Sequence, residues 1–211
     1  MINHQPEPNC GMLYIISAPS GAGKTSLVKA LLEDMDFIEV SVSHTTRAKR
    51  PGEREGIDYH FVEQAVFKQM IAAQQFLEHA QVFGNYYGTS KEHIKEKLQQ
   101  GIDIILEIDW QGAQQVRQQF EDCTTVFILP PSREELLSRL RDRGQDSDEI
   151  IERRMNEATE QVSHYEEFDY LLINDQFAHA LGELKSLIHA FRLRQSKQCH
   201  RHQQLIKSLL N

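Results

Sequence analysis

Cysteine is scarce in this chain of 211 residues, where it occurs three times, at Cys10, Cys123 and Cys199. An odd number of widely spaced cysteines argues against a disulfide framework and favours reduced thiols, as in the cytosol. Long apolar runs are also missing, since no stretch approaches the roughly 18 residues that a membrane span needs. The opening MINHQPEPNC has neither the basic nor the apolar part of a secretory signal. We therefore expect a cytoplasmic protein without membrane contact, with residues 1–10 as a flexible leader.

Positive charge is in short supply as well. The chain has 23 lysines and arginines against 31 aspartates and glutamates, which gives a formal net charge of -8. A surface that follows nucleic-acid phosphates usually makes a domain basic, so this balance argues against a general nucleic-acid binder. Any anion site must then be a local basic patch. The length suits one compact domain with inserted lobes rather than two independent domains.

Strand and helix patterns alternate along most of the chain. Uninterrupted apolar runs predict buried strands, at residues 11–17, 102–110, 124–131 and 169–174. Helical spacing and capping signals, such as the capping box of Ser132 and Glu135, predict helices. These helices are expected at residues 24–35, 91–101, 111–120, 132–144, 146–168 and 177–197, with a polar tail behind them. The alternation predicts an α/β fold, a three-layer α/β/α sandwich with a parallel central sheet.

One region interrupts this order with additional strands. An alternating pattern predicts a single strand over 37–46, and short strands at 59–62 and within 76–88 enclose a helix at 63–74. Residues 44–90 are therefore expected to form a strand-rich insertion.

The stretch SAPSGAGKTS, residues 17–26, lies between the first strand and the first helix and fits the Walker A pattern, with Ala18 where a first glycine is usual. Backbone N–H groups of such a loop surround phosphate oxygens, so Gly21 and Gly23 supply the unusual backbone angles. Lys24 would hold the β and γ phosphates, and Thr25 would bind Mg²⁺. The alternative is an unrelated glycine-rich turn. The residues expected to hold ATP are Ala18, Pro19, Ser20, Gly21, Ala22, Gly23, Lys24, Thr25 and Ser26.

A second anion site is indicated by residues 41–59, where basic and hydroxyl side chains gather in an otherwise acidic chain. Guanidinium groups and hydroxyl donors together suit a monophosphate. A solvated charged loop explains this stretch equally well when it is considered alone. The side chains concerned are Ser43, Thr45, Thr46, Arg47, Lys49, Arg50, Arg54 and Tyr59.

Taken together, the segments SAPSGAGKTS, SHTTRAKRPGEREGIDYHF, FLEHAQVFGNYYGTS, ILEIDWQGAQQV and INDQ closely resemble the guanylate kinase family. The resemblance runs from about residue 12 to residue 190. It implies ATP-dependent phosphorylation of GMP, or dGMP, to GDP by direct in-line transfer, with Mg²⁺ as the cofactor. It also implies three parts within 11–211: a P-loop core (11–43, 91–134 and 157–211), an acceptor lobe (44–90) and a mobile lid (135–156).

The resemblance assigns the acceptor site residue by residue. It implies that the GMP phosphate is held by Ser43, Arg47, Arg50, Tyr59 and Tyr87, and that guanine is read by Glu78, Thr89 and Asp109. A carboxylate suits guanine because it can accept hydrogen bonds from N1–H and N2–H₂, whereas adenine has no proton on N1 and would leave the carboxylate unpaired. The alternative for Glu78 is an ordinary exposed strand residue.

Further roles follow from the resemblance. Arg139, Arg143 and Arg154 would close over the γ-phosphate as catalytic groups beside Lys24, Arg47 and Arg50, although intrahelical ion pairs also explain arginines in this segment. Asn174 would lie near the donor adenine, or simply form a turn. Either Glu107 or Asp109 could touch the Mg²⁺ water shell, and strand alternation leaves open which one.

Two other functions fit parts of the sequence. The first is a kinase of the same fold acting on another small molecule, against which the cluster of Glu78, Tyr87 and Thr89 argues. The second is a protein-binding module, against which the intact Gly23, Lys24 and Thr25 argue. The tail segment CHRH (199–202) lacks the ligand spacing of a zinc module, so we expect no metal there. The sequence leaves open whether the protein forms a homo-oligomer.

Overall fold

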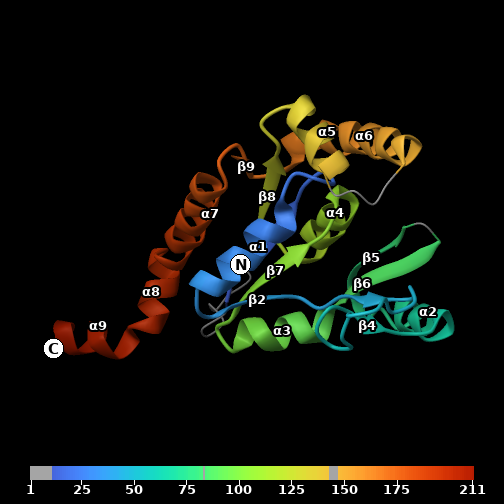
Figure 1. Ribbon diagram of the computed structural model, residues 1–211. Coiled ribbons are helices and arrows are strands. Elements are labelled where there is room, and N and C mark those ends of the chain that lie inside the picture. Colours follow the sequence, from blue (N-terminus) through green and yellow to red (C-terminus); the bar gives the residue numbers. More distant parts are fainter. Residues whose placement is uncertain (1–10, 83, 143–146) are drawn as a thin grey trace.

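The computed structural model describes residues 11–82, 84–142 and 147–211, and it confirms the predicted α/β class (Figure 1). The central sheet has five strands in the order β2-β7-β1-β8-β9, and all neighbouring strands run parallel. They are β1 (Leu13–Ser17), β2 (Ile38–Val40), β7 (Asp103–Glu107), β8 (Cys123–Leu129) and β9 (Tyr170–Ile173). Because β1 lies between β7 and β8, the segments that follow these three strands meet at one edge of the sheet, where ligands bind in open α/β sheets.

Helices cover both faces of this sheet, because the side chains of a buried strand alternate between the faces. On one face, Tyr14 and Ile16 of β1 pack with α1 (Lys24–Asp34) and α7 (Phe177–Arg192). On the other face, Leu13 and Ile15 pack with α3 (Lys91–Gln99) and α4 (Trp110–Gln119). The three-layer arrangement that the sequence predicts is therefore confirmed.

The insertion forms a second, smaller sheet with the strand order β4-β3-β6-β5. Its elements are β3 (His44–Thr45), β4 (His60–Phe61), α2 (Gln64–Ala72), β5 (Phe76–Val82) and β6 (Asn85–Ser90). Phe67 of α2 stacks on Phe76 and Tyr86, with ring centroids 4.4 and 5.4 Å apart, and so fastens the helix to the sheet.

The prediction of one strand over residues 37–46 is wrong. The segment divides into β2, which pairs with β7 in the central sheet, and β3, which pairs with β4 and β6 in the second sheet. Ser41 still continues the first ladder, since its N–H donates to Ile105 O at 2.9 Å. Alternating hydrophobicity is the same in any half-buried sheet, so it cannot show where a chain leaves one sheet for another.

Two helices follow β8 in the region expected to be the lid. They are α5 (Arg133–Asp142) and α6 (Asp148–Ser163), and they share a small apolar core that includes Leu136, Leu140 and Met155. Half of the predicted capping box forms: Glu135 N–H donates to Ser132 Oγ at 3.1 Å. The Glu135 carboxylate instead pairs with Arg139 Nε at 2.8 Å. A short 3₁₀ turn, η1 (Tyr165–Glu167), then leads into β9.

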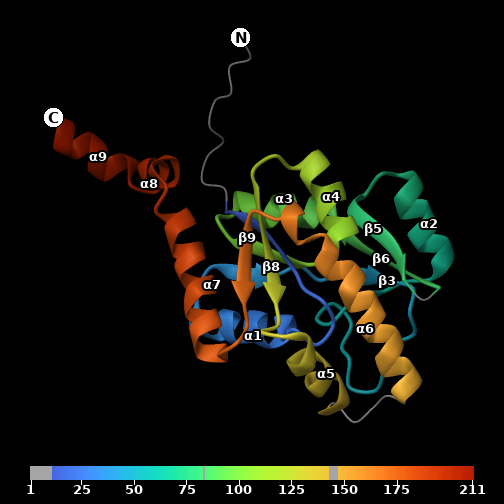
Figure 2. The same ribbon diagram turned by 90° about the horizontal axis from the view of Figure 1, so that it is seen from above.

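The end of the chain differs from the prediction of one helix over 177–197 and a polar tail. Helix α7 ends at Arg192, and two further helices follow, α8 (Gln195–Arg201) and α9 (Gln203–Leu210). The break lies at Arg194, whose backbone is extended and whose guanidinium carbon lies 4.0 Å from the centre of the Phe191 ring. Figures 1 and 2 show α8 and α9 projecting from the body of the molecule. Among the residues with described placement, no helix is both long and apolar enough to cross a membrane.

Candidate active site

The loop between β1 and α1 is shaped by two glycines. Gly21 and Gly23 have φ angles of 95° and 94°, in the left-handed region that other residues rarely adopt. A Cβ atom at Gly23 would lie 2.3 Å from Asn174 Nδ2, so a side chain there is excluded by space as well. Helix α1 begins directly afterwards, and no side chain caps its first turn. The positive end of the helix dipole is therefore directed at the loop, as in phosphate-binding helix termini.

Lys24 and Thr25 begin this helix beside the end of β7. Burial lowers the pKa of Lys24, while the carboxylates of Glu107 and Asp109 oppose this change. Glu107 is the register partner of Ile16 in β1, and it accepts a 3.4 Å hydrogen bond from Thr25 Oγ1. The structure thus places the carboxylate of Glu107, rather than that of Asp109, in contact with the Thr25 hydroxyl.

Asp109 has a different position from the one that the sequence suggested. Strand β7 ends at Glu107, and Asp109 is the N-cap of α4, where its Oδ1 accepts a 2.9 Å hydrogen bond from Gly112 N–H. The prediction of a strand over residues 102–110, which would include Asp109, is therefore wrong at its end. An aspartate two residues after a buried strand and three before a glycine in a helical pattern also fits an N-cap, which is its preferred place.

Asn174 is a buried clamp for the phosphate loop and not only a turn former. Its side chain is 4% exposed, and its Nδ2 donates to Ala22 O at 2.8 Å. Arg139 of α5 reaches the same two residues, donating to Ala22 O at 3.5 Å and to Asn174 O at 3.2 Å. The last strand, the lid region and the phosphate loop are thereby joined at one point.

The second basic site lies on the loop between β3 and β4. Arg47 is held by Glu53, since its NH2 and NH1 donate to Glu53 Oε1 and Oε2 at 2.7 and 3.1 Å. Hydrogen bonds from Arg47 are the main cause that lowers the pKa of Glu53, and the Arg50 backbone N–H, 2.7 Å from Oε2, adds to this effect. The Arg47 guanidinium also lies 5.3 Å from the centre of the Tyr59 ring. This arginine is therefore fixed in position.

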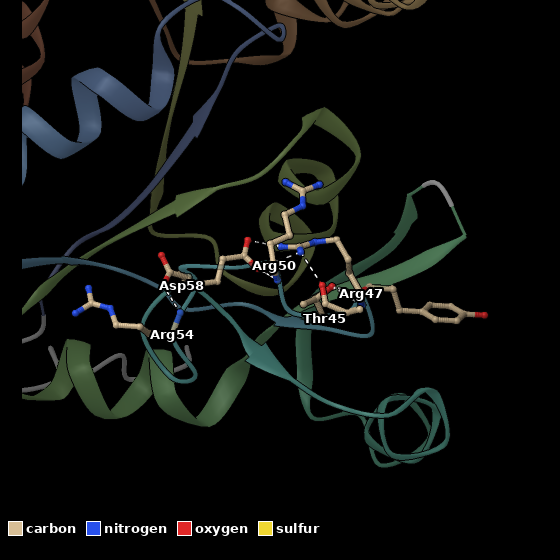
Figure 3. Close-up of polar contacts among 8 residues, drawn as sticks. Thr45, Arg47, Arg50, Arg54 and Asp58 are labelled. Carbon is tan, nitrogen blue, oxygen red and sulfur yellow. Dashed lines mark hydrogen bonds and ion pairs between the residues drawn. The ribbon is translucent and has the colours of Figure 1, made fainter. Parts of the chain in front are cut away.

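Arg50 differs from Arg47 in this respect. Its side chain is exposed, and within the described parts of the chain its guanidinium makes no hydrogen bond or ion pair. Figure 3 shows it pointing away from the loop, whereas Arg47 turns inward and Arg54 carries its own guanidinium to the other side. The Arg54 backbone N–H donates to Asp58 Oδ2 at 2.7 Å, which closes the loop without using the Arg54 side chain.

Glu78 is a buried carboxylate at the start of the hairpin of β5 and β6. It is 5% exposed, and its Oε1 accepts a 2.6 Å hydrogen bond from Thr89 Oγ1 on the paired strand. Burial raises the pKa of Glu78 to about 7, and the nearby Asp109 adds to this increase. The alternative of an exposed strand residue is excluded. The structure brings Glu78 and Thr89 together with Ser43, whose Oγ lies 3.5 Å from Thr89 Oγ1.

Two tyrosines complete this side of the lobe. Tyr59 and Tyr87 meet edge to face, with ring centroids 6.0 Å apart. Burial raises the pKa of Tyr59, so its hydroxyl stays protonated and able to donate a hydrogen bond at neutral pH.

The three arginines predicted for the lid differ in their positions. Arg139 reaches the phosphate loop, as described above, while also pairing with Glu135. Arg154 is half-buried on α6. Arg143 lies outside the described residues.

Two residues that the sequence did not single out belong to the site. Glu53 holds Arg47, and the signal for it was an acid within the basic stretch RAKRPGEREG. Gly112 makes room for Glu78, because a Cβ at this position would lie 3.3 Å from Glu78 Oε2. No local pattern marks this glycine, because the side chain that needs the space, Glu78, lies on β5, far away in the sequence.

Comparisons with known proteins point in one direction. The family model described as guanylate kinase matches residues 11–191. A guanylate kinase from Saccharophagus degradans is 58% identical over 201 residues, covering 95% of this chain and 98% of that protein. One from Escherichia coli K12 is 57% identical over 202 residues, with the same coverage. The crystal structure of guanylate kinase from Anaplasma phagocytophilum superposes with a TM-score of 0.72 at 33% identity and covers 90% of each chain.

Proposed function

The chain belongs to the guanylate kinase family, and on this premise we propose that it transfers the γ-phosphoryl group of ATP to GMP, with ADP and GDP as products. The observation that carries the proposal is the pairing of a phosphate loop with a buried carboxylate, Glu78, that Thr89 orients from the adjacent strand. The residues assigned to the acceptor bind its phosphate and its base, and none is assigned to the 2′-hydroxyl group of the sugar. The proposal therefore includes dGMP.

On the donor side, the loop from Ala18 to Ser26 binds the ATP phosphates through backbone N–H groups and the end of α1. Lys24 neutralises oxygens of the β and γ phosphates, including the bridging oxygen, on which negative charge develops during transfer. Desolvation of Lys24 strengthens this interaction, because a charge acts over a longer range where water is excluded. Asn174 holds the loop in shape through Ala22 O and borders the site of the adenine.

On the acceptor side, Ser43, Arg50, Tyr59 and Tyr87 bind the GMP phosphate together with Arg47. Arg47 is preorganised by Glu53, so little conformational entropy is lost when the phosphate binds. Glu78 accepts hydrogen bonds from guanine N1–H and N2–H₂, and Thr89 and Asp109 contribute further polar contacts. The oxygen of the bound monophosphate then attacks the γ-phosphorus in line, without a covalent enzyme intermediate.

Thr25 near the start of α1 and Glu107 at the end of β7 fit Mg²⁺. Thr25 and Glu107 offer a hydroxyl and a carboxylate, whose oxygens are 3.4 Å apart, and Mg²⁺ prefers such oxygen ligands. We assign Thr25 as a direct ligand and Glu107 as a contact through water. When bound with ATP, Mg²⁺ neutralises charge on the phosphate oxygens.

The lid supplies the remaining positive charge. Arg139, Arg143 and Arg154 are proposed to surround the transferring group when residues 135–156 close over both nucleotides. Closure also excludes water, which would otherwise accept the phosphoryl group in place of GMP. We further propose that the protein works in the cytoplasm in purine nucleotide metabolism and does not bind nucleic acid or membranes. Whether it acts as a homo-oligomer stays an open part of the proposal.

An acceptor panel tests this function. ADP release from Mg-ATP is measured by a coupled assay with GMP, dGMP, AMP, UMP, CMP and dTMP for the wild type and for Glu78→Gln. We expect fast turnover with GMP and dGMP alone, and a 10- to 100-fold higher KM for GMP in the variant, because an unpaired buried polar group costs about 1–3 kcal/mol. Turnover with a different acceptor would replace GMP in the proposal. Absence of turnover with every acceptor would instead support a protein-binding module.

A further inference from the structure

Trp110, which is the single tryptophan of the chain, lies flat against His164. The ring centroids are 3.5 Å apart and the ring planes differ by 9°. Trp110 is the first residue of α4, and His164 is the residue that ends α6. The stack therefore joins the C-terminal end of α6 to the N-terminal end of α4. Figure 2 shows this end of α6 next to α4.

Two polar side chains on the same face of α4 hold the segment that follows His164. Gln114 and Arg117 are one and two turns beyond Trp110. Gln114 Nε2 donates to Glu167 Oε2 at 2.7 Å. The Arg117 guanidinium donates to Glu167 O and to Asp169 Oδ1, both at 2.5 Å. Glu167 and Asp169 are thus fixed to the core by directional hydrogen bonds. His164 lies on α4 through the ring contact, and its Nδ1 is 2.5 Å from Glu167 Oε1.

These two kinds of contact respond differently to motion. A hydrogen bond weakens steeply when its donor turns away from the acceptor. Stacked rings keep most of their dispersion energy when one ring slides or rotates over the other, because offset arrangements are also favourable. The polar contacts of Gln114 and Arg117 therefore suit an anchor, and the contact of Trp110 with His164 suits a pivot.

The helical turn that carries Trp110 also borders the carboxylate assigned to guanine. Asp109 caps this turn and raises the pKa of Glu78 through its charge. Gly112, in the same turn, leaves the space that Glu78 Oε2 occupies. The turn that contains Trp110 therefore lies against the carboxylate to which we assign guanine.

The other lid helix is attached to the donor side. Leu136 and Leu140 of α5 pack against Gly21 of the phosphate loop, and Arg139 donates to Asn174 O at 3.2 Å. The lid is consequently tied to the donor loop through α5 and to the acceptor side through α6.

We propose that Trp110 and His164 are positioning residues for phosphoryl transfer: their stack is the pivot through which the occupied guanine site orients α6 and its Arg154. The inference rests on the proposed function. It assigns a role to residues that contact neither nucleotide, and it distinguishes the ring contact from the neighbouring hydrogen bonds.

Matched substitutions separate the ring from the polar contacts. His164→Phe keeps an aromatic ring but removes the contact of Nδ1 with Glu167 Oε1, which are 2.5 Å apart. His164→Gln keeps a polar side chain but removes the ring. Trp110→Phe and Trp110→Leu repeat this comparison on α4, and Gln114→Leu removes an anchor while the stack stays intact. Thermal unfolding by circular dichroism shows which variants remain folded at the assay temperature.

GDP formation and ADP release are then measured in the same reaction. We expect about a tenfold loss of kcat for His164→Gln and Trp110→Leu, with KM for GMP and ATP changed less than threefold. More ADP than GDP should form in these two variants, because a displaced lid admits water as acceptor. The aromatic variants and Gln114→Leu should keep kcat within twofold of the wild type. A residue with only a packing role would lower thermal stability and leave kcat and the ADP to GDP ratio unchanged, which would overturn the inference.

Emission from Trp110 provides a second readout that needs no substitution. Addition of GMP, without ATP, should change the emission of the wild type, because the base would bind the carboxylate against which the turn of the indole lies. Unchanged emission at saturating GMP would also overturn the inference. If the wild type itself does not phosphorylate GMP, the proposed function fails. If it does, and His164→Gln keeps full kcat with equal ADP and GDP, only the pivot fails.

Discussion

The donor loop and the acceptor loop both bind phosphate in our proposal, yet they are built in opposite ways. The donor loop uses backbone N–H groups, two glycines with positive φ and the start of α1, all within residues 17–26. The acceptor loop uses side chains, and its fixed arginine, Arg47, depends on Glu53 for its position. A backbone site needs the right local conformation, whereas a side-chain site needs partners that hold each group in place.

The two sites also differ in how many contacts hold their groups in place. The donor loop is clamped from outside by Asn174 and Arg139. In the acceptor loop Arg47 is fixed, whereas Arg50 is exposed and extends away from the loop. This contrast indicates a preformed donor site and an acceptor site that completes itself around the monophosphate.

Lys24→Met has the largest expected effect, because it removes the positive charge that we assign to the β and γ phosphates. We expect kcat to fall about 10³-fold, as for loss of a principal charge-stabilising donor in a transition state. The fold should survive, since methionine has a similar length and no charge to desolvate. Steady-state assays of GDP formation measure the loss.

Lys29→Met is the matched control, because Lys29 is an exposed lysine on the same helix. It should leave kcat unchanged. Full activity of Lys24→Met would show that the donor site does not work through this side chain.

The second prediction concerns Glu78, whose pKa rises from 4.5 to about 7 in the fold. Between these two values the folded protein binds more protons than the unfolded chain, so stability falls as pH rises. The raised pKa corresponds to about 3 kcal/mol between pH 4.5 and 7. Urea unfolding measures the free energy of unfolding of the wild type and of Glu78→Gln across this range. Relative to the variant, the wild type should lose about 3 kcal/mol of this free energy as pH rises from 4.5 to 7.

The raised pKa of Glu78 also predicts that GMP binds better as pH rises, whereas the stability of the protein falls. Guanine needs the ionised carboxylate, so KM for GMP should fall in the wild type as pH rises through 7 and change little in Glu78→Gln. A pH-independent difference in unfolding free energy would contradict the buried state of Glu78.

The smallest of these effects is expected from Arg50→Ala, which tests the exposed arginine of the acceptor site. Loss of hydrogen bonds to a charged group costs about 1.5–3 kcal/mol, so KM for GMP should rise about 10- to 100-fold with no change in thermal stability. Arg54→Ala is the control, since this arginine lies on the same loop and closes it through its backbone. Equal effects of both substitutions would mean that the loop acts only through its net charge.

The α/β fold could be predicted from the sequence, and the errors in the predicted strands and helices have a common cause. The alternating pattern at 37–46 did not reveal the change of sheet, and the helical pattern at 177–197 did not reveal the break at Arg194. Both patterns describe a local period, which stays the same when the chain changes its packing partner.

The sequence by itself determined the donor loop, because glycine conformation, the helix start and the flanking apolar runs all act within a few residues. It also determined the α/β class through the order of its elements. Only the tertiary structure decided which side chains meet: Glu107 contacts Thr25, Asp109 caps α4, Glu53 holds Arg47, and Asn174 supports the phosphate loop. Such contacts depend on strand register and on packing between distant segments, which no local pattern encodes.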